Sequence, residues 1–98
     1  MNARTRRADP DFQALLAATA DERTRFNAAL ANGATATLPT AFGPYTVDGV
    51  DADWWYHCHP ASANQNWANA RSFAGCNDGA WADLLAQAGV ARNPRFAR

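Results

Sequence analysis

Residues 45–60 read YTVDGVDADWWYHCHP, and this stretch decides which fold the chain can adopt. Asp48-Gly49 is a strong signal for a two-residue β-hairpin turn, because glycine tolerates positive φ and aspartate nearly does. With these two residues in the turn, the sequence predicts antiparallel strands at about 41–47 and 50–58. The hairpin is therefore the expected centre of the fold.

The second strand of this hairpin has one apolar and one polar face, because successive side chains on a strand point to opposite sides. The apolar face, which we expect in the core, consists of Val50, Ala52, Trp54, Tyr56 and Cys58. The polar face consists of Asp51, Asp53, Trp55, His57 and His59. The predicted register places Phe42 opposite Trp55, so a pair of aromatic rings is expected on the polar face.

Two helix starts precede the hairpin. Asp9 and Pro10 are typical of an N-cap and a first helical position, where the missing N–H of proline costs nothing. Thr19 and Glu22 have the spacing of a capping box, which predicts that a second helix begins there. Gly33 is placed to end this second helix, and Glu22 is expected on its solvent-exposed side.

The last helix is predicted at 79–88, with Asn77 or Asp78 as its N-cap and Gly89 as its C-terminal cap. Four apolar residues have the i, i+3, i+4, i+7 spacing of a buried stripe. They are Trp81, Leu84, Leu85 and Ala88.

The order of the elements defines the fold class. Ser62 and Gln65 form a second capping box, which predicts a helix over 62–74, and weak alternation at 35–38 predicts a short strand. Strands in one block with helices at both ends are typical of α+β proteins. We therefore predict two N-terminal helices, a central antiparallel β-hairpin or three-stranded sheet, and two C-terminal helices.

The formal net charge is zero, but the charges are unevenly distributed. All nine basic residues are arginines, and residues 9–91 contain three of them together with all nine acidic residues. We predict a single compact α+β domain at 9–91, between a disordered basic tail at 1–8 and a basic tail at 92–98. An acidic domain is not expected to bind nucleic acid, except weakly through the arginine tails.

No apolar run approaches the roughly 20 residues of a membrane span, and no apolar segment follows the basic N-terminus as in a signal peptide. We therefore expect a cytoplasmic protein without membrane contact. Its two cysteines, Cys58 and Cys76, are then expected to be reduced and buried. A disulfide between them is the alternative, since their spacing does not decide between the two states.

A zinc site is an alternative to a protein without a cofactor. His57 and His59 share one face of a strand, and Cys76 is placed to approach them from the turn between the last two helices. Zinc binds histidine nitrogen and cysteine sulfur in fourfold sites, so His57, His59 and Cys76 are the candidate ligands. Two solvent-exposed histidines at the end of a strand are the competing interpretation.

Nucleophilic catalysis has weak support. His57 and His59 point away from the adjacent Cys58, so only Cys76 with His59 as its base has an open geometry. No local signature of a catalytic family surrounds either cysteine. We therefore do not expect an enzyme.

The leading functional hypothesis is a small interaction protein of the regulator or inhibitor type, a class that includes phage- and mobile-element-encoded proteins. As a monomer or homodimer, it would bind another protein through a basic surface of that partner. The candidate binding residues are Asp51, Asp53, Trp55, His57, His59 and Phe42. The alternative is a small-molecule or sugar binder with Trp55 as a stacking platform; a helix that covers Trp55 would exclude both hypotheses.

Overall fold

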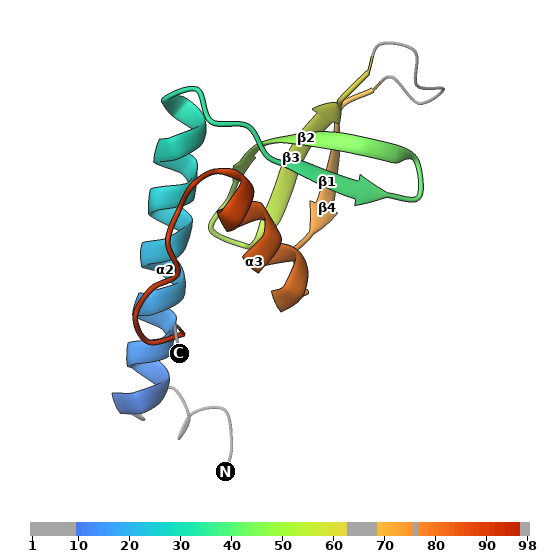
Figure 1. Cartoon of the computed structure of the whole chain (residues 1–98). Helices are drawn as coiled ribbons and strands as arrows, with labels where there is room; N and C mark the ends of the chain where they lie inside the picture. The colour runs from blue at the N-terminus through green and yellow to red at the C-terminus, as the bar shows by residue number, and fades with distance from the viewer. Residues whose placement is uncertain (1–9, 63–68, 76, 97–98) are drawn as a thin grey trace.

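The computed structural model describes residues 10–62, 69–75 and 77–96 of the 98-residue chain. One long helix precedes a four-stranded sheet, and one shorter helix follows it (Figure 1). In chain order the elements are α2 (Pro10–Ala31), β1 (Thr37–Thr40), β2 (Gly43–Val50), β3 (Trp55–Pro60), β4 (Arg71–Ala74) and α3 (Asp78–Gln87). The prediction of two helices at each end and a sheet of two or three strands is therefore wrong.

Helix α2 is continuous where two helices were predicted. The hydroxyl of Thr19 donates to the carbonyl of Leu16 at 2.8 Å, so Thr19 lies inside the helix and does not begin a new one. Glu22 is fully buried and bonds to residues near the C-terminus, although its solvent exposure was predicted. Asp9, the predicted N-cap, and the tail at 1–8 lie outside the described residues.

The end of α2 was predicted correctly. Gly33 adopts a φ of 101°, a left-handed conformation that glycine tolerates. The N–H of Gly33 then bonds to the carbonyl of Leu30 at 3.1 Å, and the N–H of Ala34 bonds to the carbonyl of Ala29 at 3.0 Å. These two bonds pair carbonyls that the last helical turn leaves free.

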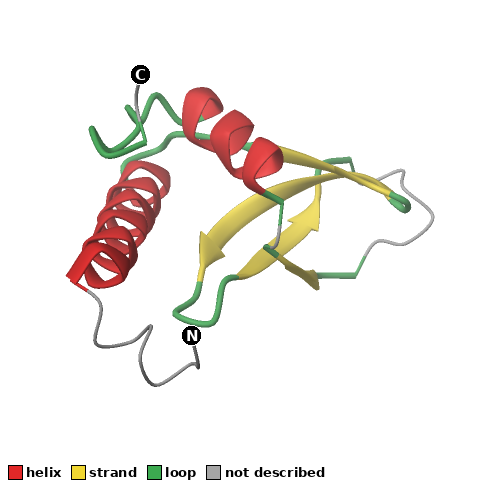
Figure 2. Ribbon diagram, turned by 90° about the horizontal axis from the view of Figure 1, so that it is seen from below, coloured by secondary structure: helices red, strands yellow, loops and turns green. Residues whose placement is uncertain are grey.

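The four strands form one antiparallel sheet in the order β1-β2-β3-β4, so each strand pairs with its neighbour in sequence. The sheet is curled, α3 crosses its concave side, and α2 stands beside it (Figures 1 and 2). Strand β4 was not predicted. It pairs with β3, with Phe73 opposite Tyr56 and Ser72 opposite His57.

The helix predicted over 62–74 is wrong at its C-terminal end, because residues 71–74 are extended. An extended conformation lets this segment hydrogen-bond to the free edge of β3, which an isolated capping-box pattern cannot reveal. The second residue of that capping box, Gln65, lies outside the described residues.

The turn between β2 and β3 lies at residues 51–54. Asp51 holds this turn closed, because its Oδ1 accepts the backbone N–H groups of Asp53 at 2.9 Å and Trp55 at 3.0 Å. Trp54 completes the turn with a φ of 64° and donates its N–H to the carbonyl of Asp51 at 3.0 Å. An aspartate that bonds to the backbone two residues further on is a known turn former.

The predicted turn at Asp48-Gly49 is wrong. Strand β2 continues through both residues, and the pairing with β3 shifts register between Val47 and Gly49. The shift brings Val50 opposite Tyr56, and both side chains are buried. The Asp-Gly signal therefore marks a bulge within a strand, a second structure that glycine favours.

The core lies between the concave side of the sheet and the two helices (Figure 2). Trp81 is central to it: its ring stacks on Tyr56 at 6.2 Å and meets Phe26 edge-on at 5.0 Å. The buried residues of the cluster are Phe26, Ala36, Leu38, Tyr45, Val47, Val50, Tyr56, Cys58, Trp81, Leu84 and Leu85.

Helix α3 agrees with the prediction to within one residue at each end. Asn77 is its N-cap, with Oδ1 accepting the N–H of Ala80 at 3.0 Å. Gly89, with a φ of 72°, follows its last turn, and the N–H of Val90 bonds to the carbonyl of Leu85 at 2.9 Å. Within the described residues, neither α2 nor α3 has the length and hydropathy that crossing a bilayer requires.

Candidate functional site

The polar face is exposed along β3. The side chain of Trp55 retains 45% exposure, while the neighbouring Tyr56 and Cys58 are buried on the other side of the strand. His57 and His59 are exposed together with Trp55. Neither helix covers Trp55, so the arrangement that would have excluded both binding hypotheses does not occur.

Each histidine of the polar face is paired with an aspartate. His57 Nε2 lies 2.8 Å from an oxygen of Asp51, and His59 Nδ1 lies 2.7 Å from an oxygen of Asp48. The hydroxyl of Ser72 on β4 lies 2.9 Å from the second ring nitrogen of His57. Ser72 and Asp48 were not among the predicted site residues, because strand β4 and the bulge in β2 bring them to this face.

Asp51 has a structural role as well as its contact with His57. The N–H of Trp55 and the ring of His57 bond to its carboxylate, and together they lower the pKa of Asp51 below its ordinary value. Asp51 is therefore ionised at neutral pH. Its pairing with His57 becomes a full ion pair only when the imidazole takes up a proton.

The chain of Asp51, His57 and Ser72 resembles the order of groups in a serine hydrolase, in which a carboxylate orients an imidazole beside a hydroxyl. The side chains of His57 and Asp51 are 52% and 39% exposed. Hydrolases of this type stabilise the developing charge in a site that excludes water. On this open surface the contacts serve to fix the orientation of the His57 ring.

Phe42 does not lie opposite Trp55, so the predicted pairing of these two rings is wrong. Phe42 belongs to the β1–β2 turn, and Trp55 pairs with Ala74 on β4. The guanidinium of Arg71 lies over the Phe42 ring at 4.0 Å from its centre. The prediction failed because it rested on the wrong turn, and the register of β2 against β3 follows from the turn.

The metal hypothesis lacks support within the described residues, which contain no group of three or more potential ligands. His57 and His59 each face an aspartate, and Cys76 lies outside the described residues. A zinc site formed by these three residues therefore stays a prediction. Cys58 is free in the structure, so the alternative of a disulfide with Cys76 is not supported, whereas the pairing of Cys76 with His59 for catalysis stays untested.

Cys58 is a buried free thiol on the core side of β3. Burial, together with the nearby charge of Asp48, raises the pKa of Cys58 to about 11. A thiol in this state is almost entirely protonated at neutral pH and is a poor nucleophile and a poor metal ligand.

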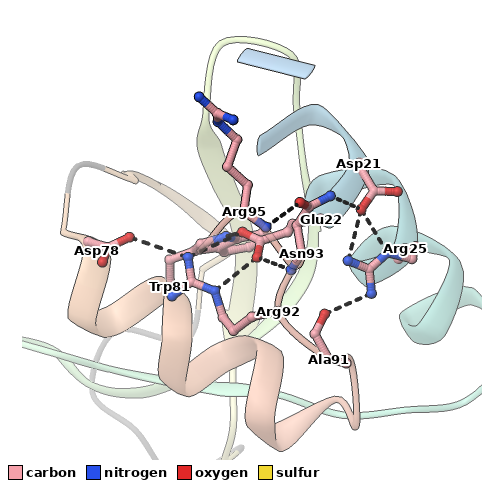
Figure 3. Close-up of polar contacts among 9 residues, drawn as sticks. All are labelled: Asp21, Glu22, Arg25, Asp78, Trp81, Ala91, Arg92, Asn93 and Arg95. Atoms are coloured by element: carbon pink, nitrogen blue, oxygen red, sulfur yellow. Dashed lines mark hydrogen bonds and ion pairs between the residues drawn. The ribbon is translucent and has the colours of Figure 1, made fainter. Parts of the chain in front are cut away.

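A second polar site surrounds Glu22 in the interior (Figure 3). One oxygen accepts the indole N–H of Trp81 at 3.0 Å. The other accepts the Nε of Arg92 at 2.9 Å and the backbone N–H of Asn93 at 2.7 Å. These bonds join α2 to α3 and to the segment after α3. Arg25 of α2 also donates to the carbonyl of Ala91 in that segment, at 2.7 Å.

Burial alone would raise the pKa of Glu22, but the hydrogen bonds from Arg92, Asn93 and Trp81 outweigh it and lower the pKa below its ordinary value. Arg92 also lies 3.7 Å from Asp78. Both oxygens of Glu22 are occupied by groups of the protein itself, so this site stabilises the fold. Its partners lie 59 and more positions away in the sequence, a distance over which local patterns carry no signal.

A cavity of about 280 Å³ lies beside the core, next to the N-terminus of α3. Three aromatic rings line it, those of Trp54, Tyr56 and Trp81. Trp54 belongs to the turn at 51–54, on the opposite side of the backbone from Trp55. A second cavity, of about 420 Å³, is lined by Phe42, Phe73 and other apolar side chains.

The chain was compared with protein-family models, with curated proteins and with solved structures. No family model matches it, and neither the curated proteins nor the solved structures contain a significant match. The functional conclusion therefore depends on the polar face of β3 and on the cavity beside the N-terminus of α3.

Proposed function

We propose that the protein is a small non-enzymatic binding module that docks a partner protein on its polar face. The exposure of Trp55 is the observation that carries this proposal. A large aromatic side chain left in water at the start of a β-strand is typical of an interface anchor, because burying it contributes much of the binding energy. Its position on a β-strand gives it a fixed orientation before binding.

The charges around Trp55 favour a basic surface on the partner. Asp48 and Asp51 each lie beside a histidine, and Asp53 is exposed in the adjacent turn. Arginine side chains of a partner would form charge-assisted hydrogen bonds with these carboxylates.

The proposal places the protein in the cytoplasm. Its support is Cys58, a buried free thiol of the kind that persists in a reducing compartment. A regulator or inhibitor type of action, as monomer or homodimer, belongs to the same proposal.

The test compares wild-type protein with the Trp55→Ala variant, each immobilised and exposed to the same extract of the source cells. We expect wild-type protein to retain a basic protein that salt releases, and Trp55→Ala to lose it with little change in melting temperature. Retention of the same proteins by both, or a large loss of stability in Trp55→Ala, would contradict the proposal. Trp54→Gly is the matched control, because it removes the adjacent indole from the opposite side of the backbone.

Native mass measurement at several protein concentrations distinguishes a monomer from a homodimer. A dimer that dissociates on the Trp55→Ala substitution would identify a second copy of the chain as the occupant of the polar face. A wild-type monomer would leave the face available to another protein.

A further inference from the structure

The cavity beside the N-terminus of α3 has the composition of a small-ligand site. Its volume is about 280 Å³ and it is open to solvent, so a single ring of modest size fits into it. Aromatic side chains form its apolar walls, and a few polar groups lie at its border, as in most small-molecule sites. The aromatic residues are Trp54, Tyr56 and Trp81, and the polar residues are Thr19, Asn77 and Asp78.

Trp54 is held in this cavity at a cost in backbone conformation. Its φ of 64° makes it the one residue other than glycine with positive φ in the described part of the chain. Bulky side chains rarely adopt this conformation, and strained residues cluster at binding sites. The indole meets Trp81 at right angles with 5.1 Å between ring centres, so the turn places it against the core.

Gly75 lines the cavity directly beside Trp54. Its N–H donates to the carbonyl of Trp54 at 2.7 Å, and a Cβ at this position would lie 2.7 Å from that carbonyl and from the ring of Tyr56. A glycine is therefore required for this close approach. The walls of the cavity are determined by packing and exist before any ligand binds.

The charges bordering the cavity are balanced, so they favour a neutral occupant. The guanidinium of Arg23 lies 5.0 Å from the ring centre of Trp54. Asp78 supplies a carboxylate, and Arg92 lies 3.7 Å from it. Of these three charged residues only Asp78 lines the cavity, and Arg92 partly offsets its charge, so an occupant needs no net charge.

The polar groups suit hydroxyl groups. Asp78 offers an 87% exposed carboxylate that only accepts hydrogen bonds. Asn77 uses its Oδ1 to cap α3, and its amide NH₂ is a donor. The hydroxyl of Thr19 donates to Leu16 and can still accept. Hydroxyl groups both donate and accept, so they match this mixture.

We infer that the cavity lined by Trp54, Tyr56 and Trp81 is a binding site for a neutral pyranose sugar. The apolar C–H face of the ring would lie on Trp54, because Tyr56 and Trp81 are almost fully buried, and its hydroxyls would bond to Asn77 and Asp78. This site lies on the other side of the strand from the polar face and is independent of it. It also differs from the sugar platform predicted on Trp55.

Ligand-observed saturation-transfer NMR on the full chain tests the inference, with D-glucose, D-galactose and N-acetyl-D-glucosamine as probes. We expect a saturable signal from at least one sugar, with a dissociation constant on the order of 1 mM. Saturation should be strongest at the C–H protons of one ring face. Tryptophan fluorescence should change over the same concentration range.

Two variants locate the site. Trp54→Gly removes the indole at a backbone position that glycine tolerates, and sugar affinity should fall at least tenfold. Asp78→Ala, at a largely exposed position, should weaken binding severalfold. It is the substitute test variant if Trp54→Gly does not fold. Trp55→Ala should bind the sugar as wild-type protein does.

Four results would overturn the inference. They are the absence of a saturable signal with every sugar, unchanged binding in Trp54→Gly and Asp78→Ala, loss of binding in Trp55→Ala, and binding of tetramethylammonium or benzyl alcohol in place of the sugars. The last result would assign the cavity to a cationic or a purely aromatic ligand.

Discussion

The indole N–H of Trp81 donates to the carboxylate of Glu22 at 3.0 Å, in the interior and across 59 positions of sequence. Trp81 is also the ring on which Phe26, Trp54 and Tyr56 pack. The carboxylate of Glu22 therefore connects the aromatic core, the cavity and the segment after α3. The stability of all three is expected to depend on Glu22.

Replacing Glu22 with alanine should destabilise the protein strongly. It would leave the indole of Trp81, the N–H of Asn93 and the charge of Arg92 without their partner. The expected loss of unfolding free energy is about 3 kcal/mol, measured by chemical denaturation. The matched control is Asp21→Asn on the adjacent, exposed position, which should lose much less. Similar losses in both variants would show that Glu22 is not the central contact.

Stability should decrease in acid through Glu22. The pKa of Glu22 is lowered in the folded protein relative to its ordinary value of 4.5. The stabilisation is therefore complete above about pH 4.5 and is lost as the pH falls through the lower, folded value. We expect the difference in unfolding free energy between wild-type protein and Glu22→Gln to shrink with falling pH. A difference that stays constant from neutral to acidic pH would contradict this linkage.

Cys58 should resist alkylation in the native protein. Its pKa of about 11 and its burial leave little thiolate at neutral pH, and the reagent cannot reach the sulfur. Peptide mapping after treatment with iodoacetamide should find Cys58 unmodified in buffer and modified in urea. Equal labelling in the two solvents would mean that β3 opens readily or that Cys58 is not in the core.

Asn27 should be needed for docking α2 on the sheet. Its side-chain amide accepts a hydrogen bond from the N–H of Val50 and donates one to the carbonyl of Val50, both at 2.9 Å. Strand β1 pairs only with the first part of β2, so it does not provide partners for Val50. Replacing Asn27 with alanine should cost about 1–3 kcal/mol in thermal or chemical denaturation. Gln87 makes the same pair of bonds to Thr37 from α3. Gln87 is more exposed, so Gln87→Ala should cost less, and the reverse order would contradict this assignment.

Local sequence patterns determined several parts of the protein. Asn77 and Gly89 predicted the ends of α3, and Gly33 predicted the end of α2, because helix caps are satisfied by residues next to them in the chain. Alternation along β3 separated the exposed Trp55 from the buried Tyr56 for the same reason. Geometry within one element is enough to establish these features.

The tertiary structure decided the rest. The signals at Asp48-Gly49 and at Thr19 with Glu22 each fit two local structures of similar energy. The sheet register that buries Val50 against Tyr56 made Asp48-Gly49 a bulge and moved the turn to Asp51. It thereby separated Phe42 from Trp55, brought Ser72 to His57 and placed Trp54 at the cavity beside α3. These outcomes depend on burying apolar surface between segments far apart in the chain, an energy that no short stretch of sequence contains.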